Sequence, residues 1–140
     1  MMDQEDIKRI IPHREPFLML DAINELEPLV RGVGTKHVNP DDPVFKGHFP
    51  GAPVLPGVLV IEALAQVGAV VLLSHPDHHG KIAYFTGIKN AKFRKSVLPG
   101  DTLTLECVLG KMRGGYGVGT AKASVEGVTV CEADIAFYAT

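Results

Sequence analysis

One stretch of the sequence, residues 47–74, constrains the fold more than any other. It begins with a segment that contains Pro50, Pro53 and Pro56, a spacing that excludes regular helix and holds the backbone extended. Residues 57–73 then contain no proline and consist mostly of good helix formers. The sequence therefore predicts one long helix over 57–73, with Pro56 well placed as its first helical residue.

The predicted long helix is apolar on all sides, which is typical of a helix that is buried on every face. Glu62 and Gln66 are its only strongly polar side chains, and because they are four residues apart they project from the same face. A carboxyl group inside a buried helix is costly unless it is paired, protonated or used. Glu62 therefore marks a candidate site. Gln66, one turn further on, could orient that carboxyl group or merely satisfy nearby backbone groups.

Length and composition favour a single domain. With 140 residues, of which 46% are hydrophobic, we expect one domain over 1–140 with a substantial core. A net charge of −2 and the absence of tryptophan give no case for nucleic-acid binding. The acidic N-terminus lacks the apolar run of a secretory signal, and Cys107 and Cys131 fall at buried phases of expected strands. We therefore expect reduced thiols and a cytoplasmic protein.

The long apolar stretch must also be compared with a membrane span. Residues 57–74 are only just long enough to cross a bilayer, carry Glu62 and Gln66 near their centre, and lack flanking basic anchors. A buried central helix is therefore favoured over a transmembrane one.

The remaining elements follow from periodicity and from turn residues. A short amphipathic helix is expected over 3–11, ending at Pro12, and a loop or single helical turn over 39–46. Strands are expected over 17–26, 30–38, 82–93, 102–109, 120–125 and 131–137. The later strands should form an antiparallel meander with a tight turn at Glu126 and Gly127. Because a flat sheet cannot cover a helix that is apolar all round, we predict an α+β fold in which a curved antiparallel sheet wraps the helix, or in which a second subunit covers the rest.

Three features converge near the start of the long helix. His48 lies on the proline-rich segment, Glu62 lies in apolar surroundings, and the helix begins at Gly57. The free N–H groups of a helix start can hold an oxygen that becomes more negative during a reaction, such as the carbonyl oxygen of a thioester. His48 could then remove the α proton as a general base, while Glu62, its pKa raised by burial, could donate a proton to a leaving β-hydroxyl. The residues alone do not decide between this elimination of water and a purely structural role, in which His48 and Glu62 would form a buried hydrogen-bonded pair.

Three motifs carry a family resemblance. They read PHREPFLMLD over 12–21, GHFPGAPVLPGVLVIEALAQ over 47–66 and YFTGIKNAKFRKSVLPGD over 84–101. In this order and spacing the chain, from about residue 7 to residue 137, strongly resembles the (3R)-hydroxyacyl-[acyl-carrier-protein] dehydratases of the FabZ type, a hot-dog fold family. Lys95 and Ser96 replace the more usual basic-proline pair, a departure that concerns the local loop geometry and not the chemistry.

The resemblance implies that His48 and Glu62 are the catalytic pair, contributed to each site by opposite subunits of a dimer, and that the Gly57 N–H binds the thioester carbonyl. It also implies a trimer of such dimers, an acyl tunnel along the dimer interface, and an acyl carrier protein with a phosphopantetheine-linked substrate as partner. The implied reaction, part of type II fatty acid elongation, yields a trans-2-enoyl thioester and needs no cofactor. Glu62 separates the chain from the related FabA-type dehydratase/isomerases, which carry an aspartate at the matching position.

Other activities stay open as alternatives. A dehydratase that also isomerises its product to the cis-3 form would be revealed by product analysis, and a hot-dog thioesterase by the release of free thiol. A non-catalytic acyl-binding module would bind its ligand without turnover.

Four basic residues lie within the third motif. Lys89, Lys92, Arg94 and Lys95 could receive an acidic carrier protein and its phosphopantetheine phosphate through charge-assisted contacts. They could equally be the solubilising charges of a strand edge.

The remaining polar clusters have a plain interpretation. The 75–80 stretch, HPDHHG, lacks the spacing of a metal site, so we expect a solvated loop and no metal. The glycine-rich stretch 114–119 lacks the pattern of a nucleotide-binding loop and is typical of a hairpin. His13 and His37 are expected to be structural or surface residues.

Overall fold

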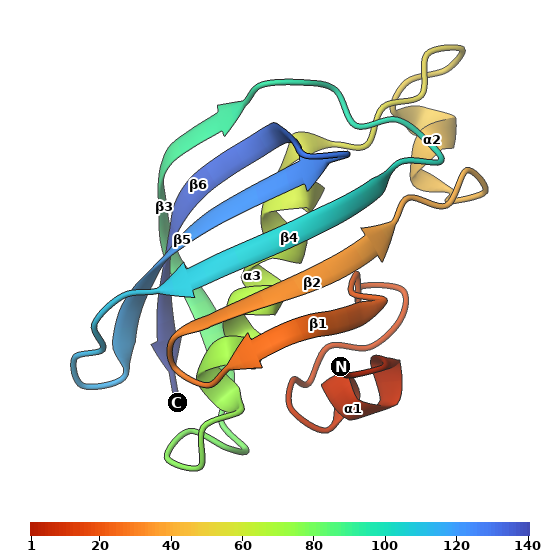
Figure 1. The fold of residues 1–140 in the computed structure, drawn as a ribbon. Coiled ribbons are helices and arrows are strands. Elements are labelled where there is room, and N and C mark those ends of the chain that lie inside the picture. Colours follow the sequence, from red (N-terminus) through yellow and green to blue (C-terminus); the bar gives the residue numbers. More distant parts are fainter.

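Six strands form a sheet that packs on one long helix in the computed structural model, which describes residues 1–140 (Figure 1). The helices are α1 (Gln4–Lys8), α2 (Val44–Gly47) and α3 (Gly57–Leu73). The strands are β1 (Ala22–Glu27), β2 (Arg31–His37), β3 (Ala83–Phe93), β4 (Thr102–Leu109), β5 (Tyr116–Val125) and β6 (Val128–Ala139). The helical turn before the proline-rich segment and the end of the long helix at Leu73 confirm the predictions for these two elements.

The start of α3 differs from the prediction by one residue. The sequence predicts Pro56 as the first helical residue, but its ψ of 132° is extended and makes it the N-cap. Gly57 is the first helical residue, and the N–H groups of Gly57 and Val58 have no acceptor within the protein. From Val60 onward every residue of α3 except Glu62 is buried. The helix is therefore enclosed along most of its length, while its first turn is open.

The strands form one antiparallel sheet in the order β1-β2-β4-β5-β6-β3. Figure 1 shows this sheet lying across α3, with β1 at one edge and β3 at the other. Alternate residues face the helix, as Leu103, Leu105 and Cys107 of β4 do, and they contribute to a hydrophobic core of 33 buried residues. This is the hot-dog arrangement that the resemblance implies.

The first strand is shorter than predicted. β1 begins at Ala22, although the sequence favours a strand from Phe17. The amide of Gln66 on α3 accepts a hydrogen bond from the Met19 N–H and donates one to the Phe17 carbonyl. Because these backbone groups bond to α3, the segment before β1 packs on the helix and does not join the sheet. The helix α1 also ends early, at Lys8.

β3 is the outer edge of the sheet and not part of the meander. It pairs with β6, while β2 occupies the position beside β4. All residues of β3 after its first are exposed, including Phe85 and Ile88 at 41% and 45%. Their partners in β6, Phe137 and Ile135, are fully buried, so Phe85 and Ile88 lie on the inner face. β3 is therefore a long edge strand with exposed apolar side chains on its inner face, and it is open to another chain.

Several local features agree with the sequence. Cys107 and Cys131 are buried free thiols. Glu126 and Gly127, both at positive φ, form the tight turn between β5 and β6. The glycine-rich stretch 114–119 supplies the turn before β5 and its first residues. None of the three helices combines the length and apolarity that crossing a membrane takes.

Candidate functional site

Glu62 lies on α3 with its side chain 15% exposed. Its Oε2 accepts a hydrogen bond from Nε2 of Gln66 at 2.9 Å. Burial raises the pKa of Glu62, and the hydrogen bond from Gln66 acts in the opposite direction but more weakly. Glu62 therefore keeps its proton to a higher pH than an exposed glutamate does, which is the state that a general acid requires.

Gln66 is 1% exposed and connects Glu62 to the N-terminal segment. Its Oε1 accepts a hydrogen bond from the Met19 N–H at 2.8 Å, and its Nε2 donates to the Phe17 carbonyl at 2.9 Å as well as to Glu62. Both protons and the oxygen of the amide are thus engaged, so its orientation is set by the backbone. The hydrogen bonds of Gln66 thus reach both the Glu62 carboxyl group and the backbone, which is compatible with both roles that the sequence allows.

His48 follows α2 at the start of the proline-rich segment. Its Nδ1 lies 2.8 Å from the Val54 carbonyl oxygen, and its ring stacks on Phe49 with centroids 3.9 Å apart. A carbonyl oxygen can only accept, so Nδ1 carries the proton of the neutral ring and Nε2 keeps a free lone pair. The imidazole is therefore held in the tautomer of a base that acts through Nε2.

A cavity of about 390 Å³ lies at the start of α3. Gly57, Phe93 and Val54 are among its lining residues, and Val54 is also the residue to which His48 bonds. A Cβ at position 57 would lie 2.5 Å from the Phe93 ring, so a side chain there would displace the ring. Because Gly57 has no side chain, the Phe93 ring can lie close to the start of α3, and the open helix start borders the cavity.

Glu62 lies at a different, smaller cavity of about 140 Å³. This cavity is lined by His13, Glu62, Ala65, Ala69, Ala83, Tyr84, Phe85 and Phe137. His48 and Gly57 are not among these residues. Within a single chain, therefore, the structure does not bring His48 and Glu62 to a common cavity.

The four basic residues lie at the end of β3 and just after it. Lys89 and Lys92 are exposed on β3, and Arg94 and Lys95 line the cavity at the start of α3. Arg94 forms an ion pair with Glu132 at 2.8 Å, whereas the three lysines have no such partner. Of the four, therefore, only Arg94 and Lys95 border the cavity at Gly57, while Lys92 lines a separate pocket with Glu132 and Asp134.

His13 is a further candidate, although the sequence predicts a structural or surface residue at this position. The structure places its Nε2 3.7 Å from Oε2 of Glu62, at the same cavity. Tyr84 and Phe85, which complete this cavity, were also not singled out. The signal that was available is position: His13 belongs to the first of the three motifs, and the two aromatic residues begin the third.

The other histidines lie away from these cavities. His37 is exposed on β2, with Nδ1 3.2 Å from the Thr102 hydroxyl. In the 75–80 loop the closest acid–histidine contact is 3.7 Å, between His75 and Asp77. No group of three or more His, Cys, Asp or Glu side chains in the structure is close enough to hold a metal ion.

Comparison with known proteins adds a family to this geometry. The family model of the FabA-like domain matches residues 11–134. A 3-hydroxyacyl-[acyl-carrier-protein] dehydratase FabZ from Roseiflexus castenholzii is 55% identical over 137 residues, which are 98% of this chain and 96% of that protein. The FabZ of Clostridium botulinum (strain Loch Maree / Type A3) is 56% identical over 136 residues, 97% of this chain and 94% of the relative.

Among solved structures, the dehydratase heterocomplex ApeI:P from Xenorhabdus doucetiae aligns with a TM-score of 0.81, covering 96% of this chain and 90% of that one. At 18% identity this likeness supports the fold alone. The family model matches most of the chain, and the two relatives cover nearly all of it at more than half identity. The chain belongs to the FabZ family of 3-hydroxyacyl-[acyl-carrier-protein] dehydratases.

Proposed function

We propose that this protein dehydrates (3R)-hydroxyacyl chains on acyl carrier protein in fatty acid biosynthesis, with His48 as general base and Glu62 as general acid. The observation that carries the proposal is Glu62 itself. It is a carboxyl group whose pKa is raised by burial, which a fully engaged amide orients, and which lines a cavity. The relatives that share more than half of the residues are named for this dehydration.

The reaction follows from the groups at the start and on the face of α3. The thioester carbonyl accepts a hydrogen bond from the free N–H of Gly57, which stabilises the charge that develops on its oxygen. Nε2 of His48 removes the α proton, the C–H electron pair becomes the new C=C bond, and the β C–O bond breaks. Glu62 protonates the departing hydroxyl, so that water and a trans-2-enoyl thioester leave. Transfer of the proton from His48 to Glu62 restores the resting state.

We further propose that each site is shared in a homodimer whose subunits meet along β3. Three observations support this. The edge of β3 is unpaired and exposes apolar side chains such as Ile88. The cavity of Glu62 is lined by Tyr84 and Phe85 of that strand, and His48 does not line that cavity within its own chain. His48 of the partner subunit would then face Glu62 across β3. Association of such dimers into a trimer stays a prediction from the resemblance.

Placing a charge on the edge strand is expected to split the dimer. Ile88→Lys buries an unpaired ammonium group in the proposed interface, a loss of several kcal/mol. Size-exclusion chromatography with light scattering should report a particle with half the mass of the dimer. Dehydratase activity should be lost as well. Val128→Lys is the matched control, because Val128 is also 45% exposed but lies at the start of β6. A dimeric, active Ile88→Lys variant would rule out this interface.

A methyl group at position 57 is expected to reduce activity more than stability. In Gly57→Ala the new Cβ meets the Phe93 ring, which is 55% exposed and can swing into the cavity that it lines. We expect kcat/KM to fall by roughly tenfold or more, because the thioester carbonyl loses its place at the helix start, while the melting temperature changes little. An unchanged kcat/KM would remove Gly57 from the thioester site.

The basic residues fit a carrier-protein contact as part of this proposal. Lys95 offers positive charge at the cavity at Gly57, and Lys89 and Lys92 are exposed on β3, an arrangement that suits an acidic carrier and its phosphate. Arg94 is less available, since it pairs with Glu132. A cytoplasmic location belongs to the same proposal and fits the two buried free thiols.

One assay separates the proposed activity from its alternatives. The purified protein is incubated with 3-hydroxyacyl carrier proteins of several chain lengths, and the products are identified by mass and by chromatography against standards. A trans-2-enoyl product is expected. A cis-3 product would identify a dehydratase/isomerase, free thiol a thioesterase, and bound but unchanged substrate a non-catalytic acyl-binding module.

A further inference from the structure

His13 presents its imidazole to the carboxyl group of Glu62, and the catalytic scheme above assigns it no task. Its Nε2 lies 3.7 Å from Oε2 of Glu62, with the two side chains 22% and 15% exposed. Its Nδ1 is buried and has no hydrogen-bond partner. The ring lies nearly parallel to that of Phe17, at 12° with centroids 6.3 Å apart. The ring therefore has one nitrogen in apolar surroundings and the other directed at the proposed acid.

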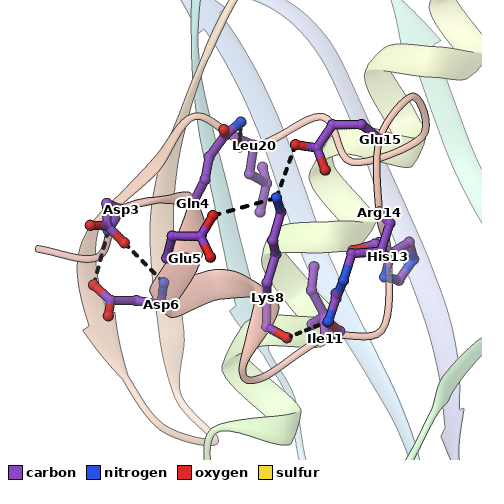
Figure 2. A network of polar contacts seen from close by, with 10 residues as sticks. All are labelled: Asp3, Gln4, Glu5, Asp6, Lys8, Ile11, His13, Arg14, Glu15 and Leu20. Carbon is purple, nitrogen blue, oxygen red and sulfur yellow. Dashed lines mark hydrogen bonds and ion pairs between the residues drawn. The ribbon is translucent and has the colours of Figure 1, made fainter.

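The segment that carries His13 is held in place by a network of polar contacts (Figure 2). Nη1 of Arg14 donates hydrogen bonds to the carbonyls of Ile11 at 3.0 Å and His13 at 2.8 Å, and Nη2 donates to that of Lys8 at 3.0 Å. The ammonium group of Lys8 pairs with Glu15 at 3.0 Å, which ties the two ends of the segment together. The position of the imidazole is thus set by backbone contacts on both sides of it.

The environment of the ring fixes its charge and tautomer. Burial lowers the pKa of His13, and the charge of Arg14 lowers it further, so the ring is neutral at pH 7. A neutral imidazole has one N–H, and a buried N–H without an acceptor is costlier than an unused lone pair. Because Nδ1 has no partner, the proton is on Nε2, the atom that faces Glu62.

One hydrogen bond and one longer contact therefore converge on the same carboxyl oxygen. Oε2 of Glu62 accepts the hydrogen bond from Gln66 and faces the Nε2–H of His13. An oxygen so placed is an acceptor, so the proton of the neutral acid belongs on Oε1. The other titratable or charged groups that face this pair are Arg14, from the same segment, and Tyr84, from β3 across the cavity.

We propose that His13 is a positioning residue of the dehydratase site: its Nε2–H points at Oε2 of Glu62, leaves the acid proton on Oε1, and stabilises the carboxylate that forms when Oε1 protonates the leaving hydroxyl. The proposal rests on the proposed function, in which Glu62 is the acid. No proton moves to or from His13, because the proton that leaves Oε1 departs in the water molecule. The contact with Oε2 shortens as the carboxylate becomes charged, since charge-assisted hydrogen bonds are shorter than neutral ones.

The test compares His13→Phe with His13→Gln in the intact oligomer. Phenylalanine keeps a planar ring over Phe17 but has no N–H, and glutamine carries an amide N–H at a similar distance from the backbone. We expect His13→Phe to lower kcat by roughly 10- to 100-fold with KM within about twofold of wild type. Without the donor the carboxylate is less stable, so the alkaline limb of the kcat–pH profile should move to higher pH. His13→Gln should restore most of the turnover and the original limb.

A control variant and a Glu62→Gln background separate a failure of the role of His13 from a failure of the proposed acid. His79→Phe, on the exposed 75–80 loop, should leave kcat unchanged. In a Glu62→Gln background, His13→Phe should have no further effect, because the carboxylate that it stabilises never forms. His13→Leu provides a second apolar variant if phenylalanine prevents assembly.

Each outcome has a distinct meaning. Wild-type kcat and an unmoved alkaline limb in an assembled apolar variant, beside an inactive Glu62→Gln, would overturn the role of His13 alone. Equal impairment of His13→Gln and His13→Phe would reduce His13 to a packing residue and overturn it as well. A fully active Glu62→Gln would overturn the proposed acid and the role of His13 with it.

Discussion

Glu62→Gln is expected to lower kcat by roughly 10²- to 10⁴-fold, because an amide cannot donate the proton that the leaving hydroxyl needs. Glutamine has nearly the same shape, and its oxygen can still accept the hydrogen bond from Gln66, so the variant should fold and assemble like the wild type. Initial rates with a 3-hydroxyacyl carrier protein measure the effect, and the melting temperature and oligomer mass check the structure.

The pH profile adds a direction to this prediction. Glu62 acts while it is protonated, so wild-type kcat should fall as pH rises through the raised pKa of Glu62. The residual activity of Glu62→Gln should lack this alkaline limb. Glu27→Gln is a suitable control, because Glu27 is exposed at the end of β1 and forms no ion pair. Retention of most activity by a folded Glu62→Gln variant would contradict the proposed acid.

His48→Ala should be similarly inactive, since the base that removes the α proton is lost, with kcat lower by roughly 10²- to 10⁴-fold. Its most informative use is in a mixture with Glu62→Gln. If each site takes His48 from one subunit and Glu62 from the other, a mixed dimer has one site with both residues intact and one with neither. Random re-association of equal amounts then restores about a quarter of the wild-type activity, since about half of the dimers are mixed and half of their sites work.

The same mixture distinguishes the shared site from a site within one chain. If His48 and Glu62 of the same subunit acted together, each site in the mixture would lack one of them, and activity would stay at the level of the single variants. Wild-type protein taken through the same dissociation and re-association is the control for recovery.

The parts of the fold that depend on neighbouring residues were predictable. The end of the proline-rich segment and the long proline-free run define α3, and the bounds of that helix agree with the prediction to the residue apart from the N-cap role of Pro56. Alternation of apolar and polar residues similarly identified β4 over residues 102–109. Glu62 could be singled out because a lone carboxyl group in an apolar helix is costly wherever that helix packs.

The parts that depend on distant contacts were not predictable. β1 begins late because Gln66, 47 residues further along the chain, bonds to Met19. The place of β3 at the sheet edge depends on which strand pairs with β4, and β2 occupies that position. His13 was missed for the same reason: its meaning comes from Glu62, with which it has no sequence relation that periodicity could reveal.

The bare edge of β3 also has a consequence for how the molecule is made. An extended, apolar, unpaired strand is a template for other unfolded chains as well as for its own copy. A newly synthesised subunit therefore either pairs with a second copy or aggregates with other unfolded chains. The protein concentration determines which of the two processes dominates. We expect strong dilution to lower the activity, and rapid refolding at high protein concentration to lower the solubility. The yield of active enzyme should therefore be highest at an intermediate concentration.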